Sequence, residues 1–230
     1  MSVAYRTAPT NLPSSTIADS DLRSDVEDEL DWDPAVPAAS IGVSVTDHAV
    51  TVSGTVHTLS HRLAAVKAVR RVKGVHAIID DIVVVPPASH GSTDQEIALA
   101  VERILEYSSS VPDGIMATLR SGLVTLTGAV DFHYQKQAAF DAVRDVKGVT
   151  WVQNNISVQP HQSDNVVRSK IVAAMHRNAD LDSRDISVVA SGHEVWLSGT
   201  TRSYAARAQA ETAAWASPGA EQVHNNIQVC

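Results

Sequence analysis

The sequence predicts an α+β protein built from three tandem α-β-β-α-β sandwiches, each a mixed three-stranded sheet with two helices on one face. The first observation is a strand-like run that ends in glycine three times, at intervals of 74 and 71 residues: Gly54, Gly128 and Gly199. The second is another glycine 20 residues later in each copy: Gly74, Gly148 and Gly219. The third is an isoleucine eight residues further on, behind a polar pair. Landmarks that keep one register indicate three copies of one small domain.

These repeats divide the chain into an arm and three domains. The arm covers residues 1–18, and the domains cover residues 19–86, 93–160 and 163–230. A domain this small buries a modest core and is only marginally stable alone, so contacts between neighbours are expected to matter.

An amphipathic helix is expected to open each domain. Leu22, Val26 and Leu30 recur at i, i+4 and i+8 in the first copy, and the other two copies keep this spacing. Acidic residues lie at or near the starts of the three helices, where a carboxylate caps free amides and suits the helix dipole. They are Asp21, Asp94 and Asp164.

Two short strands should follow as a hairpin. In the first copy they cover residues 41–45 and 50–53, on either side of Asp47 and His48. The equivalent turns of the other copies hold a Ser-Gly pair, which is typical of a tight hairpin turn.

After the first glycine, the apolar period changes from two to nearly four, which predicts a second helix. Small residues such as Ala65 and Ala68 on its buried face allow close approach to a sheet. The second glycine is expected to end this helix as a left-handed cap. A last strand follows, over residues 78–85, 151–158 and 223–229. A right-handed crossover makes it parallel to the strand before the helix.

Two further features recur in every copy. A basic residue lies eight positions after the first glycine: Arg62, Lys136 and Arg207. The polar pairs are Asp80-Asp81, Asn154-Asn155 and Asn225-Asn226, which share hydrogen bonding rather than ionisation. With the glycine-ended strand and the alanine-rich helix, this pattern resembles the bacterial BON domain, over nearly the whole chain. The third copy departs most, because Ser217-Pro218-Gly219-Ala220 replaces the VKGV of the other two.

The resemblance implies a non-enzymatic protein of osmotic or envelope stress that attaches to phospholipid surfaces. It also implies two alternatives, ring assembly and potassium sensing. The N-terminal sequence shows neither a signal-peptide core nor a lipidated cysteine, so we expect a cytoplasmic location, with peripheral attachment to the inner membrane compatible with it.

Charge limits the partners. The formal net charge is −8, and residues 20–86, 93–160 and 163–230 carry −4, −3 and −1. A nucleic-acid partner is not expected, and a membrane partner requires a local basic cluster. The ten histidines form no ligand set that repeats, so no metal, cofactor or catalytic residue is predicted.

Two charged helix faces are the candidate sites. The basic face lies on the second helix of the first copy: Arg62, Lys67, Arg70, Arg71 and Lys73. The acidic face lies on the first helix of that copy: Asp21, Asp25, Glu27, Asp28 and Glu29. The basic face suits a phospholipid surface, whereas pairing of the two faces between repeats or subunits suits a self-assembling homo-oligomer. Two solvated faces are the remaining alternative.

Tryptophan offers a weaker signal. Trp196 alternates within a strand and is expected on the open face of its sheet, and Trp151 begins the last strand of the second copy. Packing between repeats is the expected use of these side chains.

Overall fold

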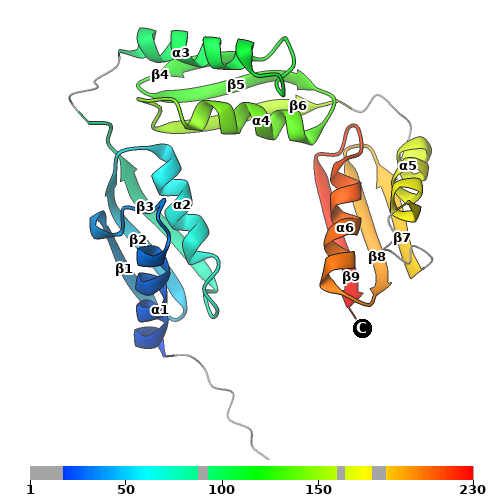
Figure 1. The fold of residues 1–230 in the computed structure, drawn as a ribbon, viewed down its shortest axis with the longest axis horizontal. Coiled ribbons are helices and arrows are strands. Elements are labelled where there is room, and N and C mark those ends of the chain that lie inside the picture. The colour runs from blue at the N-terminus through cyan, green and yellow to red at the C-terminus, as the bar shows by residue number, and fades with distance from the viewer. Residues whose placement is uncertain (1–17, 88–92, 160–163, 178–184, 230) are drawn as a thin grey trace, which may run out of the picture. The chain divides into compact units, whose positions relative to one another are not determined.

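A computed structural model describes residues 18–87, 93–159, 164–177 and 185–229. It contains three separate three-stranded sheets, each accompanied by two α-helices (Figure 1), which confirms the predicted fold class. By its internal contacts, the chain divides into two compact units, of which the first holds repeat 1 and the second holds repeats 2 and 3. The predicted N-terminal arm, except for Ala18, and Cys230 lie outside the described residues.

The elements of each repeat follow in the predicted order. Repeat 1 consists of α1 (Asp19–Trp32), the short η1 (Ala38–Ser40), β1 (Ile41–Thr46), β2 (Ala49–Val56), α2 (Leu59–Val69) and β3 (Ala77–Val84). Repeat 2 consists of α3 (Asp94–Tyr107), β4 (Met116–Arg120), β5 (Leu123–Val130), α4 (His133–Arg144) and β6 (Trp151–Val158). Repeat 3 consists of α5 (Asp164–His176), β7 (Ile186–Ser191), β8 (Glu194–Thr201), α6 (Tyr204–Trp215) and β9 (Gln222–Val229).

Each sheet has its second strand in the centre. The first strand pairs with it antiparallel and the third pairs with it parallel, as the crossover predicts. The two helices of a repeat pack on one face of its sheet, where alternate residues such as Val50 and Val52 are fully buried. The other face of each sheet is the open face, and its side chains are the candidates for contacts outside the repeat.

The first glycine of each repeat is required by a close backbone approach. Gly54, Gly128 and Gly199 have φ values of +136°, +134° and +125°. A Cβ at Gly128 would lie 2.8 Å from the carbonyl oxygen of Gly114, and Cβ atoms at the other two would collide with the carbonyl oxygens of Ser40 and Asp185. This glycine therefore lets the chain enter the first strand directly beside the second.

The second glycine of each repeat does not cap the second helix, so this prediction was wrong. Gly74 has φ +97°, but α2 ends at Val69, and the other two helices also end before their glycine. A tighter turn follows the helix instead, with the Arg71 N–H donating to the Ala68 carbonyl. The left-handed glycine therefore turns the chain into the last strand rather than closing the helix itself.

A carboxylate at the start of the first helix holds the hairpin turn. In repeat 1 this residue is Asp19 rather than the predicted Asp21, and its carboxylate accepts N–H bonds from Asp47 and His48 at 2.8 and 3.1 Å. These two bonds lower the pKa of Asp19, that with His48 most. Asp94 accepts from two turn amides and Asp164 accepts from one, so the carboxylates bridge helix and hairpin in all three repeats.

Candidate functional site

The repeated basic residue joins the second helix to the last strand. The Arg62 Nε donates to Asp80 at 3.0 Å in repeat 1, and the Asn154 Nδ2 donates to the Lys136 carbonyl at 2.8 Å in repeat 2. In all three repeats, the first residue of the polar pair also accepts the N–H of the isoleucine two residues later. The pairs act through hydrogen bonds, as predicted, and Arg62 serves the fold of repeat 1.

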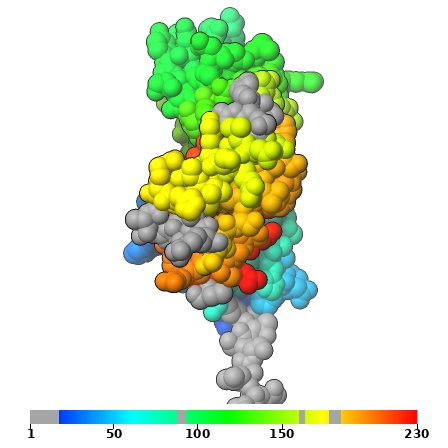
Figure 2. All heavy atoms as spheres, turned by 90° about the vertical axis from the view of Figure 1, so that its right-hand side faces the viewer, coloured from blue at the N-terminus to red at the C-terminus, as the bar shows by residue number. Residues whose placement is uncertain are grey.

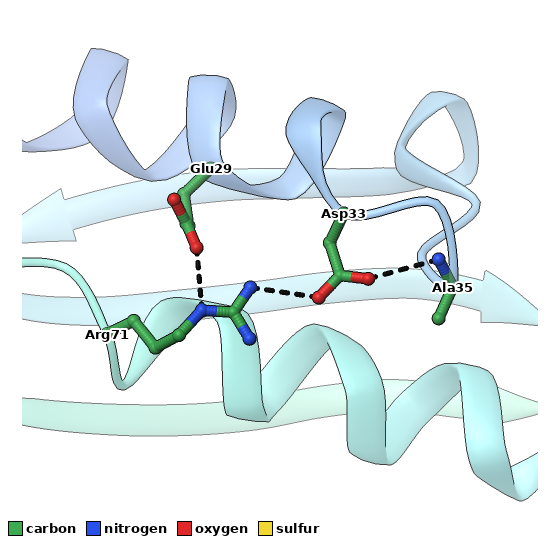
Figure 3. A network of polar contacts seen from close by, with 4 residues as sticks. All are labelled: Glu29, Asp33, Ala35 and Arg71. Carbon is green, nitrogen blue, oxygen red and sulfur yellow. Dashed lines mark hydrogen bonds and ion pairs between the residues drawn. The ribbon is translucent and has the colours of Figure 1, made fainter.

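A second arginine of the basic face is paired with the acidic helix of the same repeat. The Arg71 Nε lies 2.7 Å from Glu29, and a terminal guanidinium nitrogen lies 2.8 Å from Asp33 (Figure 3). Arg71, followed by the N–H of Ala35, lowers the pKa of Asp33, and the two carboxylates raise the pKa of Arg71. The acidic and basic helices therefore pair within repeat 1, whereas the sequence analysis expected them to pair between repeats or subunits.

The rest of the two predicted faces is solvated. Lys67, Arg70 and Lys73 are exposed and form no ion pair with any described residue. On α1, Glu27 pairs with Arg23 of its own helix at 2.8 Å. The remaining acidic candidates, Asp21, Asp25 and Asp28, are exposed. Lys67, Arg70 and Lys73 are thus the cations of the predicted basic face that have no ion pair among the described residues, and the charge of Lys67 helps to lower the pKa of Asp33.

Helix α5 of repeat 3 and the residue after it carry exposed cations that the sequence analysis missed. Arg168, Lys170 and the adjoining Arg177 are all exposed, and α5, in yellow, lies at the surface facing the viewer in Figure 2. Within α5 the only acidic residue is Asp164, whose carboxylate accepts the Gly192 N–H. The sequence contained this information, because the equivalent helices α1 and α5 differ in the sign of their net charge.

A groove adjoins two of these cations. It has a volume of about 400 Å³ and lies between α5 and the end of α6. Alanines form much of its lining, Lys170 and Arg177 contribute the charged groups, and Ser217 and Pro218 of the divergent turn complete it. A second hollow, of about 340 Å³, shares Ala173 with it and includes Arg168. Cations beside a small apolar groove suit an anionic amphiphile.

Another groove, of about 700 Å³, lies in repeat 2 between α3 and β4. Its apolar lining includes Leu99 and Met116, which are 53% and 66% exposed. Its charged lining residues are Glu102, Glu106 and Asp113. This groove repels an anionic headgroup, because its charged groups are carboxylates.

Repeats 2 and 3 contact each other through a loop and a turn. The Gly219 N–H donates to the Asp131 carbonyl at 2.9 Å, and the Val158 N–H donates to the Glu221 carboxylate at 2.8 Å. The His133 ring lies 4.3 Å from the Trp215 ring, centroid to centroid. Trp215 therefore lies at this junction, and the packing of Trp151 and Trp196 between repeats stays a prediction.

Burial at this junction lowers the pKa of His133 below 6.5. The charge of Lys136 adds to the effect and that of Glu221 opposes it. The Nδ1 of His133 is buried, and no described residue forms a hydrogen bond with it. The neutral imidazole is therefore the form that suits the junction.

Trp196 lies on the open sheet face of repeat 3, as predicted. Its ring stacks on His224 at a centroid distance of 5.3 Å, and the His224 Nε2 lies 3.1 Å from Glu194. Trp151 is 42% exposed on β6. Nowhere in the described ranges do three or more His, Cys, Asp or Glu side chains gather as a metal site. No described helix combines the length and apolarity needed to cross a membrane.

Comparison with known proteins decides the family. The family model described as "BON domain" matches residues 18–86, 93–160 and 163–230. The chain belongs to the BON domain family. The three repeats are thus tandem BON domains, and the glycines, polar pairs and basic residues above are the features that their folds share.

A known protein is similar to part of the chain. The chain is 31% identical over 114 residues to Osmotically-inducible protein Y of Escherichia coli (strain K12), covering 46% of this chain and 57% of the relative. The chain therefore matches little more than half the length of that protein. Two solved structures of CdsD, a structural protein of the type III secretion system of Chlamydia trachomatis, match at 13% identity. They cover 93% and 91% of this chain and 100% and 92% of their own, but a TM-score of 0.26 is too low to establish a shared overall arrangement.

Proposed function

We propose that this triple BON protein is a non-enzymatic protein of osmotic stress whose third BON domain attaches to anionic phospholipid surfaces. The exposed cations of repeat 3 carry this proposal: Lys170 and Arg177 line an alanine-rich groove, and Arg168 lines a second hollow on another side of α5. The relative named for osmotic induction supports the stress role. An anionic phospholipid combines a negatively charged headgroup, which suits the cations, with an apolar chain, which suits the alanine-lined groove.

Charge explains why the third domain is favoured over the first. In repeat 1, two of the five predicted basic residues are paired with carboxylates of that repeat. Helix α1 of the same repeat carries seven acidic side chains, so repeat 1 presents both signs of charge to an anionic bilayer. On α5 the cations stand without acidic neighbours in the helix beyond the N-terminal Asp164.

Cosedimentation of the full chain with vesicles tests this proposal. Vesicles of phosphatidylcholine with phosphatidylglycerol should bind the protein, phosphatidylcholine alone should bind it weakly, and added salt should release it. Reversing two charges with Arg168→Glu and Lys170→Glu should weaken binding at least about tenfold, because each cation near such a surface contributes about 1 kcal/mol.

The matched control is the double reversal Lys67→Glu and Arg103→Glu, which removes two exposed cations outside repeat 3. It should leave binding within about twofold of the unmodified chain, since attachment depends on local charge. An equal loss in both variants would show that the third domain has no special role. Absence of binding by the unmodified chain at low salt would refute lipid attachment altogether.

A further inference from the structure

The junction between repeats 2 and 3 uses two segments that recur in every repeat. We call the segment that begins the second helix the donor loop, because it supplies the ring that enters the junction; the name does not refer to hydrogen bonding. In repeat 2 this loop is Asp131–His133. The segment that ends this helix and leads to the last strand is the acceptor turn, which in repeat 3 is Trp215–Glu221. The common register makes Arg202–Tyr204 the donor loop of repeat 3 and Arg70–His76 the acceptor turn of repeat 1.

The acceptor turns differ in burial. In repeat 3, Ser217 and Ala220 are 4% and 2% exposed. The equivalent residues of repeat 2, Val146 and Val149, are 8% and 2% exposed. In repeat 1 the equivalents, Val72 and Val75, are only half-buried, and Arg71, Lys73 and His76 beside them are exposed. Repeat 1 therefore presents the least covered acceptor turn.

The donor loops differ in the opposite sense. His133 of repeat 2 is half-buried against Trp215, whereas its equivalent in repeat 3, Tyr204, is 75% exposed. Arg202 and Ser203 beside it are exposed as well. One chain thus exposes a donor loop on its third domain and an acceptor turn on its first.

We propose that these two segments bind each other between copies of this chain, head to tail, and that ionic strength controls the association. The contact repeats the junction already present between repeats 2 and 3. Tyr204 takes the place of His133 and stacks on Arg70, which takes the place of Trp215, an aromatic–guanidinium pair. The N–H of Gly74 donates to the carbonyl of Arg202, as that of Gly219 does to Asp131. Because His76 replaces Glu221, the third contact of the junction is not reproduced.

Control by salt follows from the charges that face each other. Arg202 replaces Asp131 in the donor loop, and Arg70 and Lys73 replace Trp215 and Pro218 in the acceptor turn. Three cations, with His76 beside them, meet in the intermolecular contact. The Debye length falls from about 30 Å at 0.01 M salt to about 3 Å at 1 M, so salt weakens their repulsion while the stacking and backbone contacts persist. Association therefore increases with ionic strength, which couples assembly to osmotic conditions.

The heterologous contact joins different surfaces of the two copies, so it produces a closed ring or an open filament rather than an isologous dimer. Sedimentation velocity of the full chain without lipid tests this. We expect monomer at low salt and a concentration-dependent series of larger species at high salt. Sucrose at equal osmolarity should leave the monomer unchanged, because it does not screen charge.

Two variants locate the contact. Arg202→Asp restores the charge that repeat 2 carries at this position and should strengthen association at low salt at least about tenfold. Tyr204→Ala removes the exposed stacking ring and should weaken association at high salt by a similar factor. Their matched controls are Arg103→Asp, an exposed arginine of α3, and Tyr107→Ala, a tyrosine that is 80% exposed. Both controls should behave as the unmodified chain does.

Three results would overturn the proposal: a monomer at every salt concentration, association that decreases with salt, or association that Tyr204→Ala leaves unchanged. The experiment contains no vesicles, and the attachment test uses α5 variants. Failure of one proposal is therefore distinguishable from failure of the other.

Discussion

Repeats 1 and 3 have the same fold, but the net charges of their first helices have opposite signs. Their sheets share strand order, register and the close approach at the first glycine. Helix α1 nevertheless has seven acidic residues and one arginine, whereas α5 has one acidic residue, an arginine and a lysine. The buried apolar positions, glycines and polar ties determine the fold, and the exposed helix face varies independently. Each BON domain of this chain must therefore be assigned its role from its own surface.

The largest expected effect tests the shared part. Gly54→Ala and Gly199→Ala should each reduce the free energy of unfolding of their repeat by at least about 2 kcal/mol, because the added Cβ collides with a backbone carbonyl at a φ that alanine rarely adopts. Urea unfolding followed by hydrogen exchange measures each repeat.

Gly42→Ala is the control for this pair, since a Cβ there meets Ser53 at an ordinary 3.5 Å. If Gly54→Ala were as stable as Gly42→Ala, the close approach would not be what holds the hairpin. Similar losses in repeats 1 and 3 are the expected result, because the geometry is the same in both.

A smaller difference between the two repeats should appear at the hairpin turn. Asp19 accepts two N–H bonds and the described contacts of Asp164 include one, so Asp19→Ala should lower Tm more than Asp164→Ala. The folded pKa of Asp19 is below 3.8, so its contribution is present above that pH and is lost as pH falls through the folded value. The Tm of the unmodified chain and of Asp19→Ala should converge in acid. Equal differences at pH 3 and pH 7 would contradict this.

The junction between repeats 2 and 3 should respond to a different pH range. The pKa of His133 is lowered from 6.5, so the unfolded chain binds more protons, and stability falls as pH decreases from 6.5 toward the folded value. Hydrogen exchange around Trp215 should accelerate in this range. Leu59 is the equivalent residue of repeat 1, so His133→Leu introduces the side chain that repeat 1 carries at this position. This variant should remove the acceleration, and it also removes the buried Nδ1 that has no hydrogen-bond partner among the described residues. Persistence of the acceleration in this variant would assign it to another group.

Much of the fold could be predicted because three copies display the same constraints. The glycines, the hairpin turns and the parallel last strand were each visible three times in the sequence. The pairing of Arg71 with Glu29 and Asp33 was not, because charge counts do not show which side chains of two adjacent helices meet. The divergent turn at Ser217 was noted as a departure, but only the fold reveals that it contacts repeat 2 and lines the groove beside α5.

The smallest expected effect separates two neighbouring arginines. Arg71→Gln should lower the Tm of repeat 1 slightly at low salt and less at high salt, because screening weakens an exposed ion pair. Arg70→Gln should not change Tm, since Arg70 is exposed and has no ion-pair partner among the described residues. Thermal unfolding of both variants at low and high salt provides the measurement. An equal shift in both would show that the net charge of α2, rather than the paired guanidinium, stabilises repeat 1 against the acidic α1. The ion pairs of Arg71 with Glu29 and Asp33 would then be too weak to hold its guanidinium within repeat 1. Arg71 would be available to bind a partner, as Lys67, Arg70 and Lys73 are.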